Sequence, residues 1–152
     1  MYYIKIYVFS PFLSFALFIL LFSGAHVCVS TGHYLDMVSG LYYFGLDSVD
    51  SLLGYGVEMR FDSTLRSRNH LGEFHPSCDV VLICPTQQIR NRNLRRECMD
   101  NTIVHEWLHA YEYHMLDRAF NENDVSRWAG IHLRKQRDIA EYIRSFYGNA
   151  GF

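Results

Sequence analysis

Several motifs of common enzymes are missing from this sequence. It contains no Gly-x-Ser-x-Gly elbow, no Gly-x-Gly-x-x-Gly segment and no glycine-rich phosphate-binding loop, so the usual sequence marks of serine hydrolases, dinucleotide enzymes and P-loop enzymes are absent. Its four cysteines show no Cys-x-x-Cys spacing, which argues against cysteine-ligated zinc and against a thioredoxin-like redox pair. There is no internal repeat, and 152 residues suffice for one modest domain but not for two.

Charge is missing from the beginning of the chain. Between Lys5 and Asp36 there is no Asp, Glu, Lys or Arg. The stretch from Ile6 to Val29 reaches the length of about 20 mostly apolar residues that a membrane-spanning helix requires. A short basic start, an apolar run and small residues also fit a cleaved signal peptide, and a buried core helix is a third, weaker interpretation. We therefore expect residues 1–30 to be an apolar membrane anchor or signal segment and residues 31–152 to be the folded domain.

The rest of the chain is mixed in charge, and the whole sequence has a formal net charge of −2. This composition predicts no nucleic-acid partner. One basic run, formed by Arg90, Arg92, Arg95 and Arg96, has no aromatic residues between its members that could stack on bases. We interpret it as a solvated face.

Two segments have the pattern of β-strands. Residues 57–61 alternate apolar and polar side chains, as a half-buried strand does, and residues 80–84 form a continuous β-rich apolar run that ends at Pro85. Either strand is a candidate for pairing by its edge with an extended peptide.

Helices are expected in the remaining segments. Residues 31–56 suggest one or two short helices, a longer helix is predicted from Asp100 as its N-cap to about Arg118, and a last helix from Val125 to Phe146. The fold class predicted from this pattern is α+β, with a small sheet packed against helices on one side and an apolar helix preceding them.

The predicted helix after Asp100 carries a metal-binding motif, His105-Glu106-Trp107-Leu108-His109. Two histidines four residues apart project from the same helix face, so both imidazoles can reach one zinc ion. Glu106 lies beside them, about 100° around the helix, where its carboxylate can accept a proton from a water that attacks a carbonyl. The motif predicts a Zn²⁺-dependent peptidase acting on a protein or peptide substrate, with Glu106 as the catalytic base.

A catalytic zinc ion needs a third protein ligand. The extended motif His-Glu-x-x-His-x-x-Gly-x-x-His is absent, because Glu112 occupies the position of its glycine. Candidates on the last helix are Asp138, Glu141 and His132. Glu112 is a further candidate, although on the same helix it is better placed to accept a hydrogen bond from a histidine N–H.

Three segments together resemble the ATP-synthase-assembly metallopeptidases of the mitochondrial inner membrane. They are Gly72-Glu73-Phe74-His75-Pro76, the run 80–84 ending in Cys84, and the helix segment from Val104 to Tyr111, in the same order as in that family. By this resemblance His105 and His109 match the metal ligands and Glu106 matches the catalytic glutamate. The segment from Gln136 to Ala140 is similar to a family segment that contains a glutamate, which favours Asp138 as the third ligand.

The resemblance implies a small zincin-like domain and a function. Such a peptidase would face the intermembrane space, process a precursor of a subunit of the ATP-synthase membrane sector and aid its assembly. The sequence departs from the family, since the cysteine-rich region before the Gly72 turn is missing and an apolar segment takes its place. The alternatives are a non-proteolytic membrane-anchored assembly factor, an inactive relic of the same fold, or a peptidase that enters the secretory pathway through an N-terminal signal.

Overall fold

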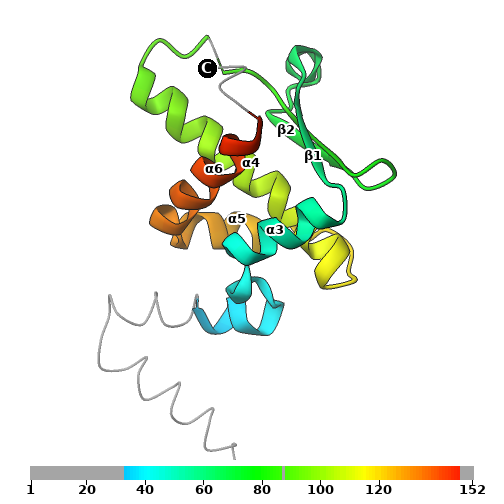
Figure 1. Ribbon diagram of the computed structural model, residues 1–152. Helices are drawn as coiled ribbons and strands as arrows, with labels where there is room; N and C mark the ends of the chain where they lie inside the picture. Colours follow the sequence, from blue (N-terminus) through cyan, green and yellow to red (C-terminus); the bar gives the residue numbers. More distant parts are fainter. Residues whose placement is uncertain (1–32, 87, 148–152) are drawn as a thin grey trace, which may run out of the picture.

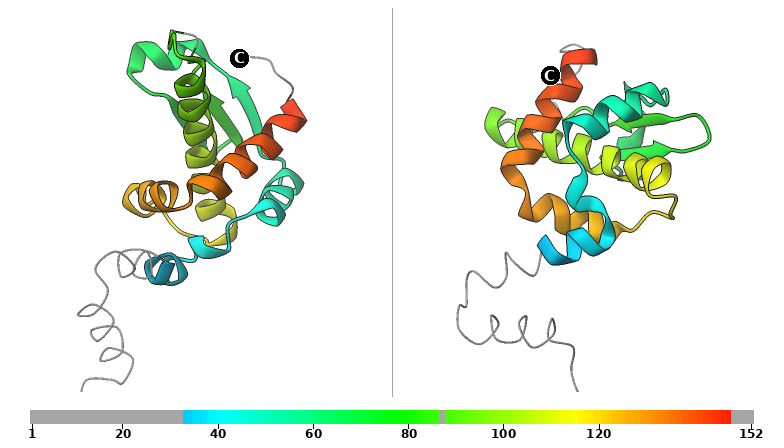
Figure 2. Two further views of the ribbon diagram at one scale, coloured as in Figure 1. Left: turned by 90° about the vertical axis from the view of Figure 1, so that its left-hand side faces the viewer. Right: turned by 60° about the horizontal axis from the view of Figure 1, so that its bottom comes forward.

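A computed structural model describes residues 33–86 and 88–147 of the chain, and it shows a mixed α+β fold (Figure 1). This confirms the α+β class predicted from the sequence. The sheet lies against one side of the long helix α4, and the other helices pack around the remainder of α4 (Figures 1 and 2). The elements in chain order are η1 (Leu41–Tyr43), α3 (Leu46–Gly54), β1 (Glu58–Phe61), η2 (Ser63–Arg68), β2 (Gly72–His75), β3 (Val80–Ile83), α4 (Arg92–Met115), α5 (Glu122–Ile131) and α6 (Leu133–Tyr147).

The sheet has three strands in the order β1-β3-β2, with β1 parallel and β2 antiparallel to β3. The predicted strands 57–61 and 80–84 correspond to β1 and β3, whereas β2 was not predicted as a strand. Because β3 lies between the other two strands, both of its edges are already paired, and the expectation that it could offer an edge to a peptide is wrong. The outer strands of the sheet are β1 and β2.

Helix α4 begins well before the predicted position. Its N-cap is Asn91, whose side-chain oxygen accepts hydrogen bonds from the backbone N–H groups of Asn93 (3.0 Å) and Leu94 (3.1 Å). The prediction that Asp100 caps the helix is therefore wrong. Asp100 lies within α4, where its buried carboxylate pairs with Arg144 of α6, so its polar side chain is satisfied by a tertiary contact instead of a helix end.

The predicted final helix is two helices. The chain leaves helical geometry at His132, which has φ −103° and ψ 40°, and this residue separates α5 from α6. No proline occurs at the break, and the nearest glycine, Gly130, lies two residues earlier within α5, so the sequence marks the helix end only weakly. It allows α6 to change direction and pack across α4 (Figure 2).

The apolar face predicted for α4 is confirmed, because its members are all buried: Ile103, Val104, Trp107, Ala110 and Tyr111. This face forms the centre of the hydrophobic core, together with side chains of the sheet, α3, α5 and α6. Trp107 of α4 and Trp128 of α5 are both completely buried. Burial of one such side chain stabilises the fold by several kcal/mol. The core therefore fixes the position of α4, and with it the segment from His105 to His109.

The predictions for the N-terminal segment concern residues outside the part of the chain that the structure describes. Residues 1–30, expected to be an apolar anchor or signal segment, belong to the residues that are not described, and helical structure is described from residue 33 to residue 39. Among the described residues, no helix combines the length and the apolar character needed to cross a bilayer.

Candidate metal centre

His105 and His109 face one another on the surface of α4 that is turned away from its apolar face. Their Nε2 atoms are 3.2 Å apart, and the two rings meet edge to face with centroids 4.8 Å apart. The helix spacing of four residues produces this arrangement, as the sequence predicted. Both nitrogens are therefore directed at the same small volume.

A third side chain, that of Glu122, completes the group. Its Oε1 atom lies 3.0 Å from His105 Nε2 and its Oε2 atom 3.1 Å from His109 Nε2. Glu122 is the first residue of α5, and Asn121 caps that helix through the backbone N–H of Asp124. Two ligands that each lie about 2.0–2.1 Å from zinc at a tetrahedral angle are roughly 3.3 Å apart. The distance of 3.2 Å between the two Nε2 atoms, and those of 3.0 and 3.1 Å from them to the two oxygens of Glu122, are close to that value.

Asp138, the third ligand favoured from the sequence, lies elsewhere. It is exposed on α6 and belongs to neither of the two groups of potential ligands found among the described residues. Glu141 pairs with Arg96 at 2.5 Å, and His132 pairs with Asp36 in the second of these groups. The structure thus brings His105 and His109 together with Glu122, which the sequence analysis did not consider.

Glu112 takes the supporting position expected for it. It is completely buried, and its Oε2 lies 3.1 Å from His109 Nδ1. The same carboxylate accepts hydrogen bonds from Arg118 and from the backbone N–H of Asn121 (3.0 Å). Glu112 therefore fixes the ring of His109 with Nε2 toward the site and also holds the loop that leads to Glu122. Such supporting carboxylates orient metal-binding histidines.

Glu106 lies beside this group with its side chain almost fully buried. Burial raises the pKa of Glu106 to about 7, against lowering contributions from His109 and from a hydrogen bond with the backbone of Phe74 in β2. Gly72 of β2 makes the approach possible, because a Cβ atom there would lie 2.6 Å from Glu106 Cγ. The start of β2 and Glu106 of α4 are thus in direct contact.

The electrostatics of the group suit a cation. Burial lowers the pKa of His105, which favours the neutral imidazole that a metal requires. Burial acts in the same direction on His109, but the hydrogen bond to Glu112 and the nearby carboxylates raise its pKa overall. For Glu122, burial is outweighed by the two histidines, which lower its pKa. The carboxylates of Glu106, Glu112 and Glu122 surround the two rings, and a divalent ion would compensate this excess of acidic groups.

A pocket of about 380 Å³ opens next to the group. It is bounded on one side by the start of β2 and the residues before it, and on the other by α4; the lining residues are His70, Leu71, Gly72, Cys98, Asn101, Thr102, His105 and Glu106. The pocket therefore reaches both a ligand histidine and the carboxylate of Glu106. Its wall at β2 is an outer strand of the sheet.

Comparison of the chain with protein-family models, with curated proteins and with solved structures finds no match. The functional assignment therefore depends on the site itself. One signal could have identified Glu122 from the sequence: an N-cap residue, Asn121, followed by an acidic residue at the start of the next helix after the His-Glu-x-x-His helix.

Proposed function

We propose that the protein is a zinc-dependent endopeptidase. The observation that carries the proposal is the convergence of three side chains next to the buried carboxylate of Glu106. The Nε2 atoms of His105 and His109 are 3.2 Å apart, and the two oxygens of Glu122 lie 3.0 Å from the first nitrogen and 3.1 Å from the second. Three protein ligands with two imidazoles and one carboxylate are the donor set of zinc peptidases, in which the fourth position stays open for water or substrate.

The donor set fits Zn²⁺ better than Mg²⁺ or Ca²⁺, which prefer oxygen ligands alone. When bound, zinc polarises a peptide carbonyl and lowers the pKa of a coordinated water to about 7. Glu112 would keep His109 Nε2 directed at the ion, because a Glu112 oxygen is hydrogen-bonded to the other ring nitrogen, Nδ1. Glu122 adds a negative charge from a separate helix, so the site depends on the packing of α5 beside α4.

Glu106 acts as the general base in this proposal. Its carboxylate takes a proton from the water as the water oxygen bonds to the carbonyl carbon. It then passes that proton to the nitrogen of the leaving amine as the C–N bond breaks. A pKa of about 7 for Glu106 is near the value at which such a proton transfer is efficient at neutral pH. The carboxylate is available to the pocket that Gly72 and Thr102 line.

Substrate binding follows from the neighbouring strand. An extended peptide can add to the outer edge of β2 through backbone groups other than that of Phe74, which Glu106 already contacts. The pocket beside Gly72 and His105 would accept one of its side chains. This places a peptide bond close to Glu106. The substrate class proposed is therefore a protein segment in extended conformation.

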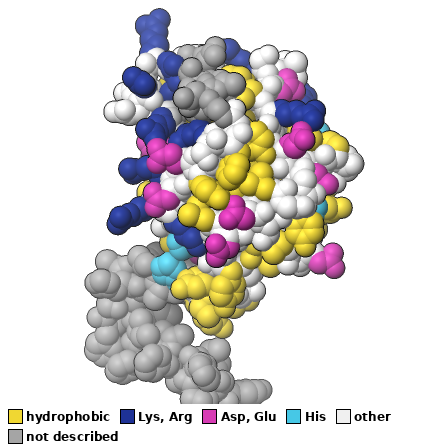
Figure 3. Space-filling view, viewed as in Figure 1, with side chains coloured by type: hydrophobic (Ala, Val, Ile, Leu, Met, Phe, Trp, Pro, Cys, Tyr) yellow, Lys and Arg dark blue, Asp and Glu magenta, His cyan; other side chains and the backbone are white. Residues whose placement is uncertain are grey.

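We also propose that the enzyme works at a membrane. The apolar stretch from Ile6 to Val29 precedes the described domain in sequence. Hydrophobic side chains continue onto the domain surface beyond it, where Tyr34, Val38 and Tyr43 are 65%, 70% and 68% exposed. Figure 3 shows hydrophobic side chains gathered at this end of the domain. By the resemblance stated above, the membrane is the mitochondrial inner membrane, and the substrate is a precursor of an ATP-synthase subunit.

The proposal is tested by removing and restoring zinc. The purified full-length chain is assayed for cleavage of a quenched fluorescent peptide library, then treated with a chelator, and then supplied again with zinc. We expect cleavage to be lost when the metal is removed. It should return when close to one equivalent of zinc is bound at His105, His109 and Glu122. An unchanged cleavage rate in the presence of the chelator would refute the proposal that the protein is a metallopeptidase.

A further inference from the structure

A second group of potential metal ligands lies at the opposite end of α5 from Glu122. It consists of His33 and Asp36, from the helical residues 33–39, and His132, which follows the last residue of α5. Because α5 has 10 residues, the two groups are separated by roughly 15 Å along this helix. The second group is therefore distinct from the centre around His105.

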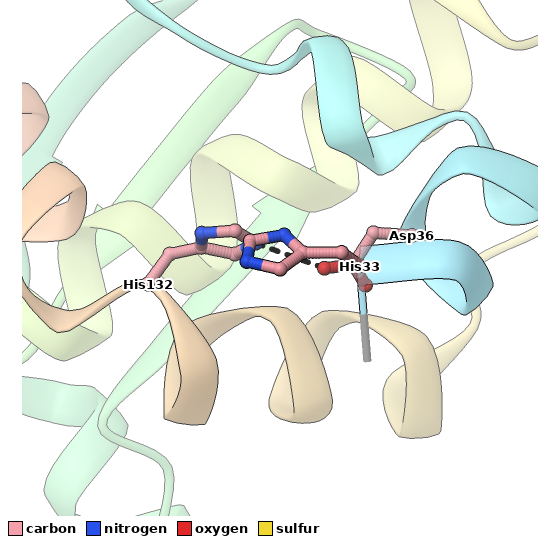
Figure 4. A group of neighbouring side chains, drawn as sticks. All are labelled: His33, Asp36 and His132. Carbon is pink, nitrogen blue, oxygen red and sulfur yellow. Dashed lines mark hydrogen bonds and ion pairs between the residues drawn. The ribbon is translucent and has the colours of Figure 1, made fainter. Parts of the chain in front are cut away.

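The three side chains converge (Figure 4). Their donor atoms all lie within 4.8 Å of one another, and His132 Nε2 is 2.9 Å from Asp36 Oδ2. The rings of His33 and His132 are 5.0 Å apart between centroids. Asp36 is completely buried, and the His132 side chain is only 12% exposed. A donor set of two imidazoles and a carboxylate is again typical of zinc.

One atom of the group has no interaction to account for its burial. A hydrogen bond between His132 and Asp36 explains the position of those two side chains, but His33 Nδ1 is buried and has no hydrogen-bond partner among the described residues. A buried polar atom without a partner is costly. A cation between the three side chains would give this nitrogen a partner.

The charges around Asp36 set a limit on the affinity. Its Oδ1 atom accepts a hydrogen bond from Arg127 Nη2 at 3.2 Å, but Arg127 also pairs with Asp124 at 2.7 Å. The carboxylate of Asp36 is thus only partly neutralised, and Oδ2 remains directed at the two rings. We expect this site to bind zinc more weakly than the site with Glu122, where three carboxylates surround the histidines.

We propose that His33, Asp36 and His132 form a second zinc site that ties the helical residues 33–39 to the junction of α5 and α6. Its role is structural, because the pocket beside His105 and Glu106 does not include these side chains and no glutamate comparable to Glu106 lies in the group. The bound ion would hold the segment that links the domain to the apolar N-terminal stretch.

A matched control exists in the same chain. His114 Nε2 also lies 2.9 Å from an aspartate, Asp79, and the His114 side chain is 14% exposed. In the described part of the chain no third ligand joins this pair. If a histidine–aspartate pair alone were sufficient to bind zinc, His114 would bind it as well as His132 does.

The test counts zinc in the full-length chain after dialysis, using a His105→Ala/His109→Ala background so that the first centre does not contribute. We expect one equivalent in this background, none after adding His132→Ala or His33→Ala, and one after adding His114→Ala. Absence of zinc from the background, or equal zinc with and without His132→Ala, would overturn the proposal. If circular dichroism shows that the background does not fold, the single His132→Ala and His33→Ala changes in the otherwise unaltered chain decide, with two equivalents expected to fall to one. The first centre is tested separately by the difference between wild type and background, so either site can fail alone.

Discussion

Replacement of Glu122 by alanine removes the one ligand of the proposed zinc centre that does not come from α4. The carboxylate of Glu122 lies 3.0 Å from His105 and 3.1 Å from His109. Its side chain is 69% exposed and contributes little to the core, so the fold should survive the change. Loss of a favourable charge in the first turn of α5 costs only about 0.3–1 kcal/mol. The main effect should therefore appear in zinc affinity.

The expected magnitude follows from the number of ligands. Structural zinc sites with four ligands bind with apparent free energies of about 10–16 kcal/mol, or roughly 2.5–4 kcal/mol for each ligand. Since each 1.4 kcal/mol is a factor of ten, Glu122→Ala should weaken zinc binding by roughly 10²–10³-fold. Asp138→Ala removes a carboxylate that is exposed on α6 and distant from the group, so it should leave the affinity unchanged.

Competition with a zinc-chelating dye measures both variants against the wild type under the same conditions. Circular dichroism checks that α5 and α6 are retained. Equal affinity in wild type and Glu122→Ala would refute the assignment of the third ligand. A steep loss in Asp138→Ala instead would restore the ligand favoured by the family resemblance and would require α6 to approach α4 differently.

Three further predictions concern the site, and a fourth concerns the membrane. Glu112→Ala removes the acceptor of His109 Nδ1 and should lower zinc affinity by about 10–100-fold; an unchanged affinity in the dye competition would show that Glu112 does not support the ligand. Gly72→Ala places a Cβ atom 2.6 Å from Glu106 Cγ and should destabilise the fold by about 1–3 kcal/mol and reduce cleavage, whereas Gly130→Ala, where a Cβ meets nothing within 4 Å, should be neutral or stabilising by denaturant unfolding; similar stability for both variants would contradict this. In the metal-free protein, the raised pKa of Glu106 favours the folded state at low pH, and about 3 kcal/mol of this stability should be lost as the pH rises from 4.5 to about 7. The difference between the unfolding free energies of wild type and Glu106→Gln should accordingly change with pH. A difference that stays constant would contradict the buried position of the Glu106 carboxylate. Finally, the full-length chain should sediment with liposomes, and recovery of all the intact chain in the supernatant would refute membrane association.

Local patterns in the sequence were sufficient for part of this structure. The face of α4 that carries His105 and His109, and the apolar run of β3, follow from helical and strand periodicity within one segment. The start of α4 was misplaced because Asp100 has the chemistry of an N-cap, and only the tertiary contact with Arg144 shows why an aspartate occurs within the helix. Strand β2 was missed because four residues, Gly72 to His75, form a strand only by pairing with β3.

The third ligand could not be read from spacing. Glu122 is 13 residues after His109, and its position depends on the loop that Glu112 holds through Arg118 and the backbone of Asn121. Such contacts between separate helices leave no periodic signal in the sequence. Asp138 was favoured through the family resemblance alone. In the structure its side chain is exposed to solvent on α6.

The central claim, that this site hydrolyses peptides, is tested most directly by Glu106→Gln. The substitution preserves the size of the side chain but removes the base, while His105, His109 and Glu122 remain as ligands. Zinc content and cleavage of the same peptide substrate are measured on wild type and variant together. We expect the variant to retain its zinc and to lose cleavage by about 10²–10⁴-fold. Equal cleavage by zinc-loaded wild type and Glu106→Gln would contradict the proposed function.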